Sequence, residues 1–160
     1  MQRSASKSAP PISLILPTGQ KWSCHSCVNN CCRHHAIEVT EEERLCILSQ
    51  GWSEKDGTPS GEALFARQPR RRGMQSYRLA HGANGACVFL NEKNLCRIHA
   101  KFGEAAKPRA CQVYPFGFHP AGGKITVSLR FSCPSVAANR GLPLEKQAGQ
   151  LQRLARMVVP

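Results

Sequence analysis

Nine cysteines in a chain of 160 residues constrain its structure more than any other feature. The chain has few large aromatic side chains, with six Phe, two Trp and two Tyr, while its 13 Gly and 11 Pro favour turns and loops. Such a chain needs cross-links to hold a small core together, and cysteines supply them as disulfides or as metal ligands. The odd number of cysteines fits a closed set of disulfides poorly.

The compartment decides between these two uses of cysteine. The only apolar run near the N-terminus, residues 12–16, is too short for the core of a signal peptide. No later segment approaches the ~18 apolar residues that a membrane span needs. We therefore expect a cytoplasmic protein with no membrane segment. Because thiols stay reduced in the cytoplasm, clustered cysteines there indicate metal binding or catalysis.

Eight of the nine cysteines have a spacing typical of metal ligands. Four lie within nine residues, and four follow singly at hairpin, turn or proline positions, from which a rigid loop can aim a thiolate inward. The predicted ligands are Cys24, Cys27, Cys31, Cys32, Cys87, Cys96, Cys111 and Cys133. Eight thiolates make two sets of four, the usual number for a structural zinc ion or an iron–sulfur cluster. We favour an iron–sulfur cluster, and zinc stays open.

Individual cysteines differ in their expected roles. Cys46 lies among apolar residues in a helical pattern, so we interpret it as a small buried core residue and not as a ligand. Cys31 and Cys32 are adjacent, and we expect their side chains to diverge and to serve different centres, or only one of them to be a ligand. Because four such residues cannot all converge, we expect at least one later cysteine sulfur within about 4 Å of the N-terminal group.

The pattern along the chain predicts short elements. Thr40 and Glu43 form a capping box, which predicts a helix that ends at Gly51. We interpret residues 52–80, which show little pattern, as a variable surface insertion with a short helix at 62–67. The other expected elements are a strand at 12–16, hairpins turning at 91–94 and 121–123, and a helix at 99–106.

Together these elements predict a small, irregular α+β fold. It is a cysteine-rich domain stabilised by metal, with short antiparallel hairpins and a few short helices. We expect three regions: a flexible lead-in over residues 1–20, the cysteine-cluster domain over 21–139, and a linker with an amphipathic helix over 140–160.

The last region carries one apolar stripe at helical spacing. Its members are Leu144, Ala148, Leu151, Leu154, Ala155 and Val158, which predict a helix over residues 143–158. An isolated helix of this length is marginal in water, so the stripe needs a cover. We favour an exposed stripe that binds a protein partner or a further domain over one that packs back on the cysteine domain.

The cysteines and their neighbours also resemble a known family. The motifs are Cys24-x2-Cys27-x3-Cys31-Cys32, Cys87-Val-Phe-Leu, Cys96-Arg-Ile, Pro-Arg-Ala-Cys111-x2-Tyr114-Pro-Phe116 and Ser-Cys133-Pro. In this order they resemble the YkgJ-type cysteine-cluster family, also called the zinc- or iron-chelating domain, over roughly residues 21–139. The resemblance implies that the eight cysteines chelate metal. The family includes flagellin lysine N-methylases, but beyond the shared cysteines the chain shows no methylase signature.

The chain is basic, with 22 Lys and Arg against 10 Asp and Glu. Most of these charges are scattered, which favours solubility over a nucleic-acid partner; the exception is the run at residues 70–72, expected in an exposed loop. Three functions stay open. They are a metal-stabilised binding domain, which we favour; an enzyme or electron-transfer module, such as a lysine N-methylase; and a zinc-stabilised nucleic-acid binder.

Overall fold

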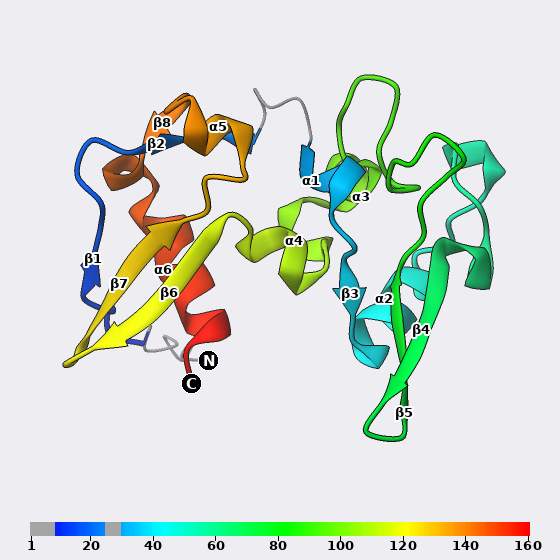
Figure 1. The fold of residues 1–160 in the computed structure, drawn as a ribbon, viewed down its shortest axis with the longest axis horizontal. Helices are drawn as coiled ribbons and strands as arrows, with labels where there is room; N and C mark the ends of the chain where they lie inside the picture. Colours follow the sequence, from blue (N-terminus) through cyan, green and yellow to red (C-terminus); the bar gives the residue numbers. More distant parts are fainter. Residues whose placement is uncertain (1–8, 25–29) are drawn as a thin grey trace, which may run out of the picture.

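The computed structural model describes residues 9–24 and 30–160. Its elements form two lobes that lie side by side, and the short helix α4 (Arg109–Val113) lies between them (Figure 1). Each lobe has its own buried cluster of hydrophobic residues. Mixed helices and short, mainly antiparallel strands confirm the predicted small α+β fold.

The first lobe is built on a three-stranded antiparallel sheet with strand order β3–β5–β4. Its elements are α1 (Asn30–His34), β3 (Glu38–Val39), α2 (Glu41–Ser49), the 3-10 turns η2 (Glu54–Asp56) and η3 (Gly61–Leu64), β4 (Phe65–Arg71), β5 (Met74–Leu79), α3 (Arg97–Phe102) and η4 (Glu104–Ala106). The core of this lobe centres on Trp52, Phe89 and Ile98. Trp52 and Phe89 meet edge to face, with ring centroids 5.3 Å apart.

The second lobe combines both ends of the described chain. Its elements are β1 (Leu14–Ile15), β2 (Lys21–Trp22), β6 (Phe116–Ala121), β7 (Lys124–Leu129), α5 (Pro134–Ala137), β8 (Leu142–Pro143), η5 (Leu144–Gln147) and α6 (Ala148–Val158). The predicted hairpin turning at 121–123 is confirmed as β6–β7, and the predicted strand near residue 14 is confirmed as β1, which pairs parallel to β7. β2 pairs antiparallel to β8.

Helix α2 confirms the predicted capping box. The Thr40 hydroxyl accepts a hydrogen bond from the backbone N–H of Glu43, at 3.1 Å, and the Glu43 carboxylate accepts one from the backbone N–H of Thr40, at 2.8 Å. The helix ends before Gly51, whose φ of 71° lies in the left-handed region that glycine adopts without strain. Reciprocal bonds of this kind satisfy backbone donors that a helix start otherwise leaves unpaired.

We expect Thr40→Ala to lower the free energy of unfolding by about 1 kcal/mol, because it removes the side-chain acceptor of this cap. Urea denaturation measures the change. Thr40→Ser is the matched control, since serine keeps the hydroxyl, and it should stay close to the wild type. Equal losses in both variants would show that the methyl group of Thr40, and not its hydrogen bond, supports the helix.

Two interpretations of the first lobe are wrong. Residues 52–80 are not a surface insertion, because Trp52, Leu64 and Leu79 are part of the core. The short helix expected at 62–67 is instead the end of η3 followed by strand β4. In β4, side chains that face the core alternate with side chains that face solvent over only a few residues, and Pro69 interrupts the pattern. The strand was therefore not recognised in the sequence.

Cys46 is also placed differently from the expectation, because it is exposed on α2. The buried position on this helix is its neighbour Ile47, which is 2% exposed. The apolar residues around Cys46 therefore do not all face the core, and Leu45 remains 53% exposed.

The apolar stripe at the C-terminal end is covered, so the expectation of an exposed stripe is wrong. Leu144, Leu151 and Leu154 are completely buried in the core of the second lobe, on η5 and α6. The N-terminal segment lies against the same helix, since the Ile12 N–H donates to the Gln152 side chain at 2.8 Å. A protein partner at this helix stays a prediction.

Within residues 9–24 and 30–160, we find no helix with the length and apolar character that crossing a membrane requires.

Candidate metal centre

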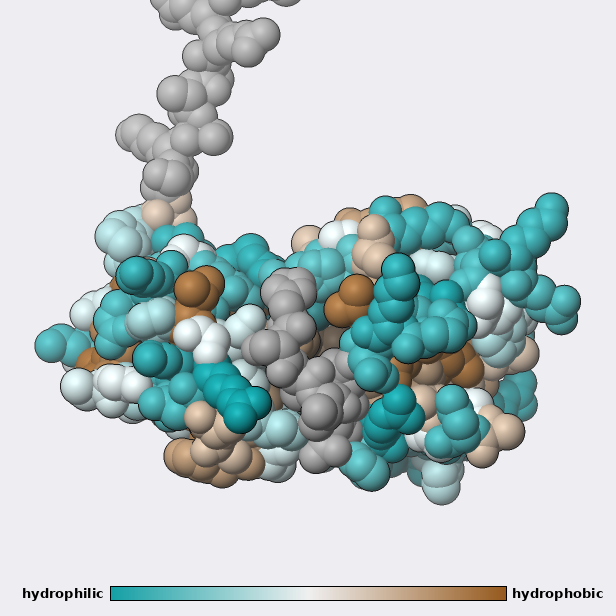
Figure 2. Space-filling view, turned by 90° about the horizontal axis from the view of Figure 1, so that it is seen from above, coloured by the Kyte–Doolittle hydropathy of each residue, from teal (hydrophilic) through white to brown (hydrophobic). Residues whose placement is uncertain are grey.

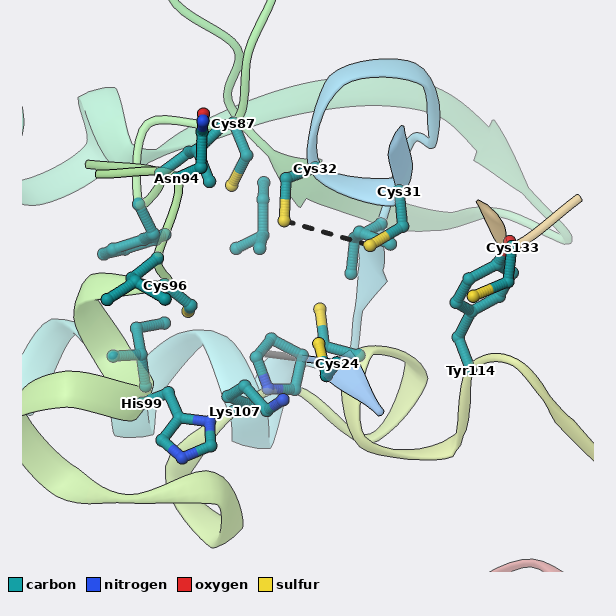
Figure 3. A pocket seen from close by; sticks show the side chains of 18 of the residues that line it. Cys24, Cys31, Cys32, Cys87, Asn94, Cys96, His99, Lys107, Tyr114 and Cys133 are labelled. Atoms are coloured by element: carbon teal, nitrogen blue, oxygen red, sulfur yellow. Dashed lines mark hydrogen bonds between the residues drawn. The ribbon is translucent and has the colours of Figure 1, made fainter. Parts of the chain in front are cut away.

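One cavity collects the predicted ligands. It has a volume of about 180 Å³ and is lined by residues of both lobes, including Trp22, Phe89 and Tyr114. Seven of the eight predicted cysteines line it: Cys24, Cys31, Cys32, Cys87, Cys96, Cys111 and Cys133. Six of them are labelled in Figure 3. The eighth, Cys27, lies outside the described residues. Cys46, the cysteine excluded from the predicted set, does not line the cavity.

Helix α1 brings two of these thiols together. The sulfur atoms of Cys31 and Cys32 are 3.9 Å apart, and Figure 3 shows both at the same side of the cavity. The expectation that adjacent cysteines diverge is therefore wrong for this pair. Tetrahedral metal–sulfur bonds of ~2.3 Å place two sulfurs about 3.8 Å apart, so this pair has the spacing of two ligands of one ion.

The first lobe holds the next two cysteines against α1. The backbone N–H of Cys87 donates to the carbonyl oxygen of Cys32 at 2.7 Å, so the N-terminal and later cysteine segments are in direct contact. Cys96 follows the turn at 91–94 and pairs with Leu90 in a single antiparallel bridge. The sequence predicted a hairpin at this turn. Cys87 is 8% exposed and belongs to the core of this lobe. A 4 Å separation between sulfurs of the two segments stays a prediction.

The remaining cysteines approach from the second lobe and from the connection between the lobes. Cys24 follows strand β2, Cys111 lies on α4, and Cys133 directly precedes α5. Cys133 is buried in the core of the second lobe, whereas Cys111 packs against the core of the first lobe. Figure 3 shows Cys133 beside the ring of Tyr114. The cavity is thus bounded by thiols from both cores.

Burial makes two of these thiols, those of Cys87 and Cys111, hard to ionise, because it raises their pKa values. Burial raises the pKa of Cys87 to about 11. Burial, with the added charge of Cys87, also raises the pKa of Cys111 above its ordinary value. In the α1 pair, the hydrogen bond between the thiols lowers the pKa of Cys31 to about 6, while Cys32 keeps the proton and its pKa rises. Several thiolates can coexist here only if positive charge compensates them, as a metal does.

The donor set fits a thiophilic metal, although it is not closed around one ion. Among the described residues, no three Cys, His, Asp or Glu side chains are close enough together to hold a metal ion. Thiolate donors are the ligands of zinc and of iron–sulfur clusters. The chemistry of the lining therefore fits the predicted metal.

Several lining residues were not predicted as parts of a site. His99, Lys107 and Asn94 line the cavity, and no motif marked them. Lys107 and Pro108 directly precede α4, so the proximity of Lys107 to Cys111 in the sequence was the only available signal. The ring of His35 packs edge to face on Tyr114, with centroids 4.9 Å apart. It therefore contacts a residue of the cavity wall and does not itself line the cavity.

A thiol-lined cavity of this kind defines a metal-binding cysteine-cluster domain. Comparison with known families matches residues 23–134 to the family CxxCxxCC, described as "Putative zinc- or iron-chelating domain". The match covers more than half of the chain, so this chain belongs to that family, and the predicted metal-binding cysteine cluster is confirmed at this level. The chain departs from the spacing in the family name, since three residues instead of two separate Cys27 from Cys31.

Two kinds of curated relative are similar over a short stretch. The chain is 32% identical over 56 residues to the flagellar biosynthetic protein FliU of Salmonella muenchen, which is 35% of this chain and 33% of the relative. The same identity and length apply to a lysine-N-methylase of Salmonella typhimurium, of which the stretch covers 14%. The chain thus matches no more than a third of either relative. No solved structure matches the chain.

Proposed function

We propose that this chain is a cytoplasmic metal-binding domain whose metal lies in the cavity between the two lobes. The proposed ligands are the thiolates of Cys24, Cys27, Cys31, Cys32, Cys87, Cys96, Cys111 and Cys133. The observation that carries the proposal is the convergence of seven of these residues on one cavity from parts of the chain as far apart as Cys24 and Cys133. Reduced thiols of this kind fit a cytoplasmic location.

The proposed metal joins the two lobes. Cys87 belongs to the core of the first lobe and Cys133 to the core of the second, so a centre bound by both fixes the lobes relative to each other. Metal binding is coupled to folding when the ligands come from distant parts of a chain, because the unfolded chain has no preformed site. The domain would then work by holding its metal and by presenting a rigid two-lobed surface.

We favour an iron–sulfur centre over a single zinc ion. A cavity of about 180 Å³ has room for several water molecules, which is more space than one tetrahedral ion requires. The Cys31 and Cys32 sulfurs have the spacing of two ligands of one metal ion. Thiols arranged around a larger space suit a polynuclear cluster, whose inorganic sulfide fills the interior.

Anaerobic purification followed by absorbance, metal and sulfide measurements tests this proposal. We expect bound iron, acid-labile sulfide and broad absorbance in the visible range. Colourless protein with bound zinc would keep the metal centre and reject the iron–sulfur assignment. Protein that holds neither metal after anaerobic purification, and that takes up neither on reconstitution, would reject the metal centre itself.

A second function, protein lysine N-methylation, is supported by the similarity to lysine-N-methylases over 56 residues. Transfer of labelled methyl groups from S-adenosylmethionine to lysines of an acceptor protein would support it. The chain matches only 14% of such a relative, so we place this function second. Metal content alone would not support it, since a metal-binding domain without methylase activity would hold the same metal.

A further inference from the structure

A second and more polar cleft adjoins the thiol cavity. Its volume is about 390 Å³, within the size range of small-molecule sites. One wall comes from η4 of the first lobe, with Glu104, and from α4, with Gln112. The other wall comes from η5 and α6, with Lys146 and Gln150. The cleft and the cavity share six lining residues: Trp22, Cys24, His99, Lys107, Cys111 and Tyr114. The two spaces therefore meet at two of the proposed ligands.

The charged groups of the cleft favour an anion. Among the described residues of its lining, the only carboxylate is that of Glu104, which is bound by two side chains: Arg153 at 3.4 Å and the Gln150 amide at 3.0 Å. In contrast, Lys107 and Lys146 form no salt bridge with any residue among 9–24 and 30–160. The two ammonium groups therefore leave a net positive charge at the mouth of the space that leads to the thiols.

The polar groups of the cleft are also held in place, as in a preformed site. The Gln112 amide donates to the carbonyl oxygens of Lys107, at 2.7 Å, and Ala105, and its own oxygen accepts from Arg153. Across the cleft, the Gln147 amide donates to the carbonyl oxygens of Trp22 and Leu142. These bonds fix both walls before any ligand enters.

We propose that this cleft admits small anionic molecules, carboxylates or phosphates, to the metal centre, with Lys107 and Lys146 attracting the acid group. The inference rests on the proposed metal centre, and it implies that small solutes can reach the metal there. A purely structural zinc site is closed by protein ligands, whereas an open site can be reached by a solute. Cys24 and Cys111 are the ligands that such a solute meets first, because they line both spaces.

The rate of metal removal by two chelators tests the proposal on the metal-loaded protein. EDTA is a polycarboxylate anion, and 1,10-phenanthroline is uncharged. We expect removal by EDTA to accelerate with EDTA concentration and to slow by about 3- to 10-fold in Lys146→Gln, because cleft charges raise the on-rates of oppositely charged solutes. Removal by phenanthroline should keep its wild-type rate. High salt should reduce the effect of the substitution on EDTA.

Lys124→Gln is the matched control, since Lys124 is an exposed lysine at the β6–β7 turn that lines neither space. It should leave both rates unchanged. The proposal is overturned if EDTA removal is independent of EDTA concentration, if Lys146→Gln and the wild type lose metal to EDTA equally fast, or if both chelators slow together. Protein that contains no metal would instead refute the proposed centre, and this inference would fall with it.

Discussion

Cys87→Ser should lose bound metal and most of its folded structure. Cys87 is 8% exposed, packs in the core of the first lobe and contacts α1 through its backbone. Metal binding at a structural thiolate site contributes on the order of 10 kcal/mol, which is similar to the ~5–15 kcal/mol net stability of a domain. A centre deprived of one buried ligand should therefore leave the two lobes unable to stay folded together. Metal analysis and circular dichroism of the purified variant measure both losses.

Cys46→Ser is the matched control, because Cys46 is exposed on α2 and does not line the cavity. An exposed substitution of this kind should change the free energy of unfolding by less than ~0.5 kcal/mol and leave the metal content unchanged. If Cys46→Ser released metal, the ligand set would be wrong. If Cys87→Ser kept the full metal content, Cys87 would be a core residue and not a ligand.

Leu151→Ala should destabilise the second lobe by about 2–5 kcal/mol, because it leaves a cavity at a completely buried position on α6. Leu45→Ala is the control, since Leu45 is a helical leucine that is 53% exposed, and it should change stability by less than ~0.5 kcal/mol. Urea denaturation of both variants measures the difference. Equal effects would mean that α6 does not contribute to the core as its burial indicates.

Deletion of residues 141–160 extends the same prediction. It removes Leu144, Leu151 and Leu154, three of the eight buried residues of this core. Because Cys133 is buried in the same core, we expect the shortened chain to lose metal as well as stability. A truncated protein that kept its full metal content would show that the metal centre folds without the second lobe.

The sequence predicted the elements whose signals are local. The capping box at Thr40 and Glu43 and the Gly-rich turn at 121–123 each depend on residues a few positions apart, and both appeared where expected. The cysteine set could also be found locally, since cysteines are rare and their spacing is typical of ligands. The structure brings seven of these cysteines to one cavity, which agrees with the predicted ligand set.

The parts of the fold that the sequence did not predict depend on contacts between distant residues. Gly141 was expected in a linker, yet the segment around it is held to the N-terminal part of the chain, since the side chain of Asn139 accepts a hydrogen bond from the Lys21 N–H at 2.7 Å. At Gly141, with φ of 109°, a Cβ atom would lie 2.5 Å from the backbone of Trp22. Similarly, Trp52 and Leu79 reach the core through a hairpin with interrupted alternation. No local sequence pattern indicates which distant part of the chain will cover an apolar residue.

The pairing of the two ends of the chain sets an order of folding. The second core needs β1 and Trp22 together with segments as late as Met157, so it cannot close until the chain through Met157 has left the ribosome. The first core uses residues between Cys32 and Cys111 and can form earlier. During synthesis, Cys133 is therefore the last of the proposed ligands to arrive. A metal bound by the earlier thiols would therefore have an incomplete set of ligands until the segment with Cys133 packs in place.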